Sequence, residues 1–331
     1  MDYLLEIDDL HTYFKTKKGT VKAVNGVSYR VEAGKTLGIV GESGSGKSVS
    51  AMSILKLLDG NGYIDSGEIK FKGRNLVECS QNDMYQIRGN EISVIFQEPM
   101  TSLNPVYTIE KQLNEVYLTH QKISKEEASK KSLEMLNAVK IPNAKSIMKQ
   151  YPHQLSGGMR QRVMIAMALA CEPSLLIADE PTTALDVTIQ AQILDLMRDL
   201  QKKIKTSIII ITHNLGVVAN IADRVAVMYG GKLVETGDVE DIFHNPCHEY
   251  TKGLLRSIPK AHEKGGELQA IPGTPPDLME PPVGCPFAAR CKETMIVCQK
   301  YMPDYTDCGK NHKSACWMLD EMAQEVNSDE K

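Results

Sequence analysis

Short apolar runs alternate with longer amphipathic segments along the first 255 residues. The apolar runs are rich in β-branched side chains and lie at residues 36–40, 92–96, 175–178, 207–211 and 224–228. Runs of this kind are typical of parallel strands that are buried on both faces of a sheet. Between them, residues 125–139 and 188–203 carry apolar side chains at helical spacing, with charged outer faces. The alternation predicts an α/β fold.

A change in composition follows these elements. Residues 258–282 contain six prolines and three glycines, a mixture that predicts a linker wrapping an ordered surface. We therefore expect two domains, residues 1–255 and residues 256–331, the second containing a cysteine-rich segment. Residues 321–331 are polar and are expected to fray. No internal repeat is visible, so one α/β unit per chain is expected.

Overall charge and hydropathy narrow the class of protein. The 331 residues include 38 Lys and Arg against 42 Asp and Glu, so the net charge of −4 carries no basic excess of the kind that nucleic-acid binding favours. No apolar stretch approaches the roughly 20 residues that a membrane span needs. The N-terminus has no basic segment followed by an apolar core, so no signal peptide is expected. These features predict a cytosolic chain that does not cross a membrane.

A glycine-rich loop joins the first apolar run to a helical segment at residues 49–58. Residues 41–48 read GESGSGKS and match the G-x-x-x-x-G-K-[ST] phosphate-binding pattern in its required strand–loop–helix context. Glycines let backbone N–H groups point at phosphates, and the helix N-terminus adds positive potential. We expect Lys47 to neutralise the β- and γ-phosphates of ATP and the Ser48 hydroxyl to bind Mg²⁺. The predicted nucleotide ligands here are Gly41, Ser43, Gly44, Ser45, Gly46, Lys47 and Ser48.

Two acidic residues end the third apolar run. Asp179 and Glu180 follow four apolar residues, so a buried strand delivers both carboxylates to its C-terminal end. Asp179 suits the water shell of Mg²⁺, and Glu180 suits the polarisation of a water for attack on the γ-phosphate.

Residues 155–162, LSGGMRQR, begin 20 residues before that strand and lead into a helical segment. Here the chain resembles the ATP-binding subunits of ABC transporters, for which LSGG is the signature. The resemblance covers nearly the whole chain. It implies a P-loop NTPase fold with a helical signature subdomain. It also implies that two subunits sandwich ATP, with Ser156, Gly157 and Gly158 of each facing the phosphate loop of the other.

The resemblance assigns roles to further residues. Gln97 matches the glutamine that senses Mg²⁺ and the attacking water, and His213 matches the switch histidine that contacts the γ-phosphate. Asp186 matches the loop that crosses the dimer, and Phe14 matches the aromatic that stacks on adenine, with Tyr13 as the neighbouring alternative. The expected catalytic residues are thus Glu180, His213 and Gln97.

Two segments narrow the resemblance. Residues 98–105, EPMTSLNP, follow Gln97 directly, and residues 245–255, NPCHEYTKGLL, precede residues 284–291, GCPFAARC. The latter pair is similar to the C-terminal extension of oligopeptide and dipeptide importer ATPases, whose close relatives include nickel importer ATPases. The chain departs from the family pattern at Asn214, where Asp is usual after the switch histidine. It departs also at Glu249, in place of proline, and at Trp317, in place of histidine.

This resemblance implies an ATPase subunit that energises the import of di- and oligopeptides. It would lie peripherally on the cytoplasmic face of the cell membrane, with two permease subunits, a paralogous ATPase in a heterodimer, and indirectly an extracytoplasmic peptide-binding protein. A nickel importer would share every motif. A non-transport ABC protein acting on ribosomes or DNA is disfavoured, because one nucleotide unit and no long coiled coil are visible. A redox sensor with ATPase output is a third alternative.

Five of the eight cysteines crowd near the C-terminus, at Cys285, Cys291, Cys298, Cys308 and Cys316. A cytosolic chain rarely builds a disulfide framework, so the cluster favours metal ligation over disulfides and over plain reduced thiols. The family resemblance implies an iron–sulfur site held by Cys285, Cys291, Cys298 and Cys316. Thiolates suit [4Fe–4S] or Zn²⁺ by chemistry, and the absence of a tight C-x2-C spacing favours iron–sulfur over zinc. Cys308 would be a spare thiol.

Overall fold

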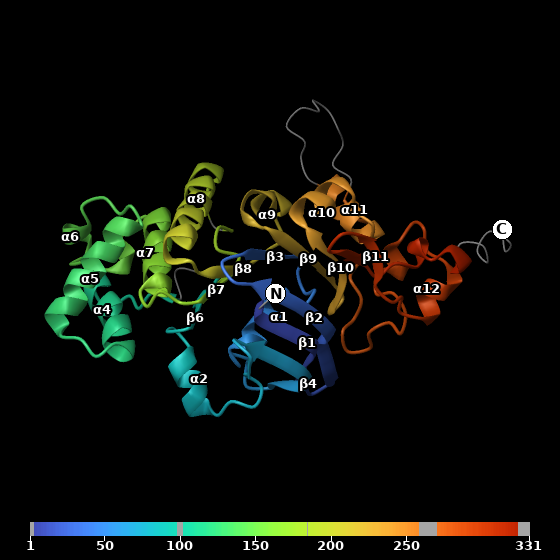
Figure 1. The fold of residues 1–331 in the computed structure, drawn as a ribbon, viewed down its shortest axis with the longest axis horizontal. Helices are drawn as coiled ribbons and strands as arrows, with labels where there is room; N and C mark the ends of the chain where they lie inside the picture. The colour runs from blue at the N-terminus through green and yellow to red at the C-terminus, as the bar shows by residue number, and fades with distance from the viewer. Residues whose placement is uncertain (1–2, 98–101, 184, 258–269, 324–331) are drawn as a thin grey trace. The chain divides into compact units, whose positions relative to one another are not determined.

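The computed structural model describes residues 3–97, 102–183, 185–257 and 270–323 (Figure 1). The chain forms two compact units that do not follow chain order. The first contains Val31–Thr36 and Glu78–Ile211, and the second contains Tyr3–Arg30, Leu37–Val77 and the chain from Thr212 onward. Neither compact unit begins or ends near residue 255, so the predicted domain boundary there stays a prediction.

Three parallel strands form the sheet of the first unit. They are β6 (Ile92–Ile95), β7 (Leu175–Asp179) and β8 (Ser207–Thr212), with β7 in the middle. Every residue of β7 and β8 is buried, as the continuous apolar runs predicted. The β6–β7 register pairs Ile92 with Leu175. Because the carboxyl ends of parallel strands meet at one edge, this register brings the segments after β6 and β7 to the same edge of the sheet.

Helices make up the rest of the first unit (Figure 1). They are α2 (Gln81–Ile87), α4 (Ile109–His120), α5 (Lys125–Ala138), α6 (Ala144–Ile147), the 3₁₀ turn η1 (Pro152–Gln154), α7 (Gly157–Leu169) and α8 (Val187–Ile204). Tyr117, Ala128 and Ala170 form a small buried cluster in the helical part. The helices predicted at residues 125–139 and 188–203 are confirmed to within one residue at each end. Side chains of Thr108, Ser124 and Ser156 cap the helices that follow them.

An antiparallel sheet opens the second unit. Its strands are β1 (Tyr3–Thr16), β2 (Gly19–Glu32), β4 (Gly62–Phe71) and β5 (Arg74–Asn75), in the order β2-β1-β4-β5. Helix α1 (Lys47–Ile54) follows β3 (Thr36–Val40). Sequence patterning did not anticipate this antiparallel sheet, because Asp9 has a left-handed φ of 45° and the β1–β4 register shifts after Asp8. The shift interrupts the two-residue alternation that would have revealed β1.

A second sheet completes this unit. β9 (Arg224–Tyr229) pairs in parallel with β3, and β10 (Lys232–Asp238), β12 (His312–Ser314) and β11 (Thr306–Gly309) continue in antiparallel order. The associated helices are α9 (Leu215–Ile221), α10 (Val239–His244), α11 (Glu249–Arg256) and α12 (Ile296–Lys300), with 3₁₀ turns η2 (Ala288–Arg290) and η3 (Trp317–Leu319). The cysteine-rich segment thus supplies strands to the edge of this sheet.

One buried cluster joins that segment to the rest of the second unit. The rings of Tyr229 and Tyr250 have centroids 4.5 Å apart, and each lies 5.3 Å from the ring of Phe287. Tyr229 is on β9, Tyr250 is on α11, and Phe287 belongs to the cysteine-rich segment. Packed aromatic rings contribute beyond their buried area. Within the described residues, no helix is both long enough and apolar enough to span a membrane.

Candidate phosphate-binding loop and catalytic residues

The loop at residues 41–48 curls around the side chain of Lys47. This side chain is buried, and its Nζ donates hydrogen bonds to the carbonyl oxygens of Gly41 at 2.9 Å and Glu42 at 2.7 Å. Helix α1 begins at Lys47 itself, so the loop leads directly into a helix N-terminus. The carbonyl oxygens of its own loop thus hold the Lys47 side chain in place inside the curl. This arrangement suits an anion with several negative charges.

Two glycines make the tight curl possible. Gly46 has a φ of +96°, and a Cβ there would lie 2.3 Å from the carbonyl oxygen of Ala23 on β2. At Gly41 a Cβ would lie 2.1 Å from the carbonyl oxygen of Met228 on β9. Both contacts are far shorter than any side chain tolerates, so only glycine fits. Ser45 is buried, whereas Ser43, Gly44 and Ser48 are exposed on the loop.

In the first unit, two predicted catalytic residues lie in direct contact. Gln97 Nε2 donates a hydrogen bond of 3.0 Å to Glu180 Oε2, and the Thr183 hydroxyl donates to the same oxygen at 2.9 Å. Glu180 has a left-handed φ of 45°, and its backbone N–H donates to the carbonyl oxygen of Ile211. Asp179 is buried at the end of β7. A non-glycine residue held in left-handed geometry is unusual and clusters at functional sites.

The LSGG segment forms a helix start. The Ser156 side chain accepts a hydrogen bond from Met159 N at 3.4 Å and caps α7, whose first residues are Gly157 and Gly158. A Cβ on Gly158 would lie 3.0 Å from the side chain of Ile189 on α8, so this glycine permits close helix packing. Asp186 Oδ1 accepts from Ile189 N at 3.0 Å and caps α8. The exposed N–H groups of the α7 terminus are a suitable anion site.

The remaining predicted residues lie in the second unit. His213 is exposed directly after β8. Asn214 caps α9, because its Oδ1 accepts a hydrogen bond from Gly216 N at 2.9 Å. Asp and Asn serve equally as helix caps, which explains how this departure from the family pattern leaves the local structure intact.

Phe14 is half-buried on β1 against Gly62, where a Cβ would lie 2.7 Å from the Phe14 ring. Tyr13 is also half-buried, and its hydroxyl donates to Asn25 Oδ1.

Comparisons with known proteins identify the family. The ABC transporter family model matches residues 24–183, and the model of the oligopeptide/dipeptide transporter C-terminal region matches residues 234–298. The dipeptide transport ATP-binding protein DppD of Bacillus subtilis is 54% identical over 98% of this chain and 97% of its own length. The oligopeptide transport ATP-binding protein OppD of the same organism is 55% identical over 99% of this chain and 92% of its own.

The chain belongs to the ABC transporter family of ATP-binding proteins. Among solved structures it is similar to the dimeric ATP-binding cassette MJ0796 bound to ADP and phosphate. That likeness has a TM-score of 0.64 and 26% identity over 71% of this chain and 98% of the other. Another similar structure is cbiO1 from Clostridium perfringens, with a TM-score of 0.64 and 27% identity over 74% of this chain and 92% of that one. The predicted P-loop fold of an ABC ATPase is confirmed. Residues 98–101 of the predicted 98–105 segment lie outside the described residues.

A contact that sequence reasoning missed links the C-terminal extension to the phosphate loop. Arg290 makes a bidentate ion pair with the Glu42 carboxylate, at 2.5 Å and 3.0 Å. The same guanidinium donates to the Tyr229 hydroxyl at 3.0 Å, and Glu42 N donates to the Tyr250 hydroxyl at 2.8 Å. The Arg290 side chain is 5% exposed. The sequence feature that could have indicated this contact is Glu42. An acidic residue in a phosphate-binding loop repels phosphate unless a cation such as Arg290 pairs with it.

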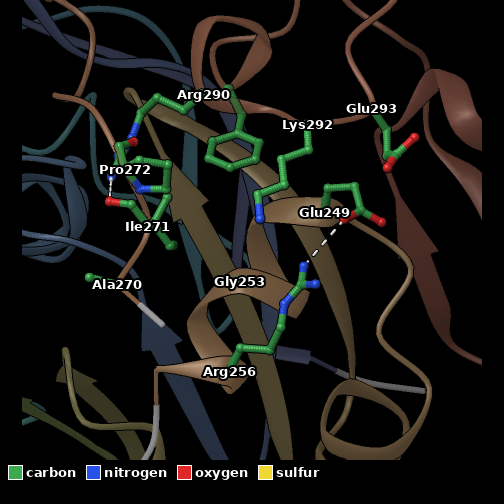
Figure 2. Close-up of a pocket in the computed structure, with 10 residues that line it drawn as sticks. Glu249, Gly253, Arg256, Ala270, Ile271, Pro272, Arg290, Lys292 and Glu293 are labelled. Atoms are coloured by element: carbon green, nitrogen blue, oxygen red, sulfur yellow. Dashed lines mark hydrogen bonds and ion pairs between the residues drawn. The ribbon is translucent and has the colours of Figure 1, made fainter. Parts of the chain in front are cut away.

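A cavity of about 380 Å³ lies beside Arg290 (Figure 2). Its walls come from α11, from residues 270–272 and from the segment around Phe287. Arg256 pairs with Glu249 across one side at 3.5 Å, as the dashed line in Figure 2 marks. Arg290 donates to the carbonyl oxygens of Ile271 and Pro272 at 3.0 Å and 2.8 Å, which holds this chain segment against the cavity. Within the predicted linker, residues 258–269 lie outside the described part.

The iron–sulfur prediction is wrong on these findings. The relatives' names refer to peptide transport and ATP binding, and none refers to an iron–sulfur cluster. Among the described residues, the Cys and His side chains gathered at metal-ligand distance are Cys247, Cys308 and His312, none of which belongs to the predicted set. The four predicted ligands Cys285, Cys291, Cys298 and Cys316 are buried or half-buried thiols.

The surroundings of the four thiols explain the correction. Cys285 and Cys298 belong to the apolar core of the extension, together with Phe287 and Met295. Cys298 Sγ accepts a hydrogen bond from Met295 N at 3.5 Å. Cys285 and Cys298 are therefore part of the apolar core of the extension.

Proposed function

We propose that this chain is the ATP-hydrolysing subunit of a membrane importer of di- and oligopeptides. The observation that carries the proposal is the match of residues 234–298 to the oligopeptide/dipeptide transporter C-terminal region, because the ATPase motifs alone are common to all ABC proteins. End-to-end identity of 54–55% with relatives named for dipeptide and oligopeptide transport adds support. The names of these relatives favour peptides over nickel and over non-transport roles.

The phosphate loop would bind the ATP phosphates. The exposed backbone at Ser43 and Gly44 and the buried, loop-held Lys47 support this role, with Gly41, Ser45 and Gly46 shaping the loop. Mg²⁺ prefers oxygen ligands, and the exposed Ser48 hydroxyl at the start of α1 and the carboxylate of Asp179 suit it, with Gln97 as a further oxygen donor. When bound, the ion neutralises charge on the phosphates.

Glu180 would polarise the attacking water. Its Oε2 already accepts two hydrogen bonds, from Gln97 and Thr183, which fixes the carboxylate in one orientation. Gln97 would exchange its contact with Glu180 for contacts to the water, and His213 would hold the γ-phosphate. Hydrolysis then needs no covalent intermediate, because positioning and charge stabilisation supply the catalysis.

The working assembly would be a dimer of ATPase subunits, with a paralogous ATPase as partner. The exposed helix start at Ser156, Gly157 and Gly158 would contact the γ-phosphate held by the partner, and Asp186 would lie at the dimer contact. Phe14 would stack on adenine. Residues 1–255 would form the nucleotide-binding domain and residues 256–331 the importer extension. The two ATPases would bind peripherally to two permease subunits at the cytoplasmic face of the membrane. An extracytoplasmic peptide-binding protein would deliver peptides to the permeases.

Uptake measurements test the proposal. Cells carrying the wild-type protein are compared with cells carrying Glu180→Gln, both supplied with a peptide mixture and radioactive nickel. Selective loss of peptide uptake is expected. Loss of nickel uptake alone would assign the protein to metal import, and unchanged uptake of both would contradict the importer proposal.

A further inference from the structure

Three potential metal ligands meet at the edge of the second sheet. Cys247 lies in the loop between α10 and α11, Cys308 lies on β11, and His312 begins β12. The two Sγ atoms and a ring nitrogen of His312 all lie within 4.8 Å of one another. The three residues come from segments 61 and 4 residues apart in sequence, so folding alone brings them together. None of them has a role in ATP binding.

A buried carboxylate organises this group. Glu235 on β10 is fully buried, and its Oε1 accepts hydrogen bonds from Cys247 N at 2.6 Å and from His312 Nε2 at 2.8 Å. Its Oε2 accepts from His248 N at 3.0 Å. The carboxylate therefore fixes both the backbone that carries one thiol and the plane of the imidazole. A carboxylate bonded to a ligating histidine is the usual outer support of a metal site.

Packing holds the imidazole from its other side. His312 is 2% exposed, and a Cβ on Gly237 would lie 3.0 Å from its ring. The two thiols are half-buried, so a solvent-borne ion can reach them. A rigid, buried ring facing two accessible sulfurs is an arrangement that core packing does not require.

We propose that Cys247, Cys308 and His312 form a zinc-binding site, positioned by Glu235 and separate from the nucleotide. Two thiolates and an imidazole bind zinc in preference to magnesium or calcium, which favour oxygen ligands. Tetrahedral zinc with bonds of about 2.0–2.3 Å holds its ligand atoms about 3.4–3.8 Å apart, so side-chain rotation closes the present spacing. The two thiol protons leave to solvent as zinc binds. A water completes the fourth position.

The site would cross-link the end of the extension to the sheet. The β11–β12 hairpin is short, and β12 pairs with β10 through the neighbours Glu235 and Thr236. Zinc at Cys247 and Cys308 would close a loop of about 60 residues, and a closure of this length markedly reduces the entropy that the chain gains on unfolding. Zinc binding would therefore raise the stability of the extension and would take no part in the chemistry at the phosphate loop.

Zinc titration of the full chain tests the proposal. Protein is purified under reducing conditions, stripped with a chelator, and titrated with Zn²⁺ against a chromophoric competitor, then with Co²⁺ for its absorption spectrum. We expect one tight site per chain, with thiolate-to-cobalt charge-transfer bands. Cys247→Ser and Cys308→Ser should each weaken zinc binding at least 100-fold, beyond the roughly 10–100-fold that loss of an outer-shell partner costs.

Matched controls separate this site from the other thiols. Cys291→Ser, also at a half-buried cysteine of the extension, should bind zinc as the wild type does. Zinc should raise the melting temperature of the wild type and of Cys291→Ser but not of Cys308→Ser, each compared with its own zinc-free form. The proposal is overturned if zinc binding follows Cys291 instead. It is equally overturned if both serine variants bind normally, or if rapid thiol trapping in cells recovers a Cys247–Cys308 disulfide.

Discussion

Single residues of the phosphate loop are selected by space as much as by chemistry. Gly46→Ala would place a Cβ 2.3 Å from the Ala23 carbonyl oxygen in a left-handed backbone. Backbone strain and overpacking together should lower the free energy of unfolding by about 2–5 kcal/mol and abolish ATP binding. Chemical denaturation and a nucleotide-binding assay measure the two effects. Gly60→Ala is the control, because a Cβ there meets nothing within 4 Å; equal effects of both changes would argue against the steric explanation.

Lys47→Ala tests the charge of the same loop. The buried ammonium contacts the carbonyls of Gly41 and Glu42, so its removal takes the main positive charge from the loop without a change in glycine geometry. We expect ATP binding to fall beyond detection, because charge-assisted contacts to phosphate are strong and nothing else in the loop is cationic. Equilibrium binding of a fluorescent ATP analogue measures this. Wild-type affinity would contradict the phosphate-binding role.

Glu180→Gln separates hydrolysis from binding. The amide keeps the size of the side chain and can still contact Gln97 and Thr183, but it cannot accept a proton from water. The expected result is ATP binding near the wild-type level with hydrolysis reduced about 10²–10⁴-fold, and a dimer that accumulates with ATP. Phosphate release and size-exclusion chromatography measure the two. Normal turnover would remove Glu180 from the catalytic role.

At the scale of elements, η2 of the extension is tied to the phosphate loop by one ion pair. Arg290 holds both carboxylate oxygens of Glu42, and the carboxylate raises the pKa of the guanidinium. A double-mutant cycle with Arg290→Gln and Glu42→Gln should give a coupling energy of about 0.5–3 kcal/mol in the free energy of unfolding. Each single change should also weaken ATP binding, because the Glu42 carbonyl helps to hold Lys47. Additive effects would mean that the pair does not position the loop.

Some strands and helices could be predicted from the sequence and others could not. The five buried strands were predictable because continuous β-branched runs have few other uses, and β3 begins and ends where the pattern placed it. The LSGG helix and the glycine loop were also predictable, because each motif needs a helix start. β1 was not, since the bulge at Asp9 breaks its alternation. The β11–β12 hairpin was hidden because its residues are mostly polar and its pairing partner, β10, lies far away in sequence.

The same distinction applies to side chains. Glu180 could be named from its place after a buried strand and Gln97 from the family resemblance, and the structure brings the two into contact. The Arg290–Glu42 pair spans 248 residues and carries no local pattern, so it emerges only from the fold. The iron–sulfur site was mispredicted because the crowding of cysteines in the sequence does not show which side chains surround each thiol in the fold. Cys285 and Cys298 pack with Phe287 in the apolar core, whereas Cys247 and Cys308, distant in sequence, gather with His312 at metal-ligand distance.

At the scale of the whole molecule, the extension belongs to the same core as β9 and α11. Phe287 packs against Tyr229 and Tyr250, and Ala315 N donates to the Val234 carbonyl oxygen on β10. Deletion of residues 256–331 would therefore expose an aromatic cluster and the edge of β10. We expect the truncated chain to aggregate or to melt at a lower temperature, not to behave as an independent ATPase domain.

Phe287→Ala gives the quantitative form of that prediction within the intact chain. Phe287 is 4% exposed, and its truncation to alanine should cost about 3–5 kcal/mol of unfolding free energy through lost burial and a residual cavity. Ile296→Ala on α12 is the control, because that side chain is 53% exposed and should cost about 0.5 kcal/mol or less. Denaturation followed at the phosphate loop by bound-nucleotide fluorescence should report the same loss for Phe287→Ala. If unfolding of the extension left nucleotide binding unchanged, residues 256–331 would be a separable domain after all, and the loop would not depend on it.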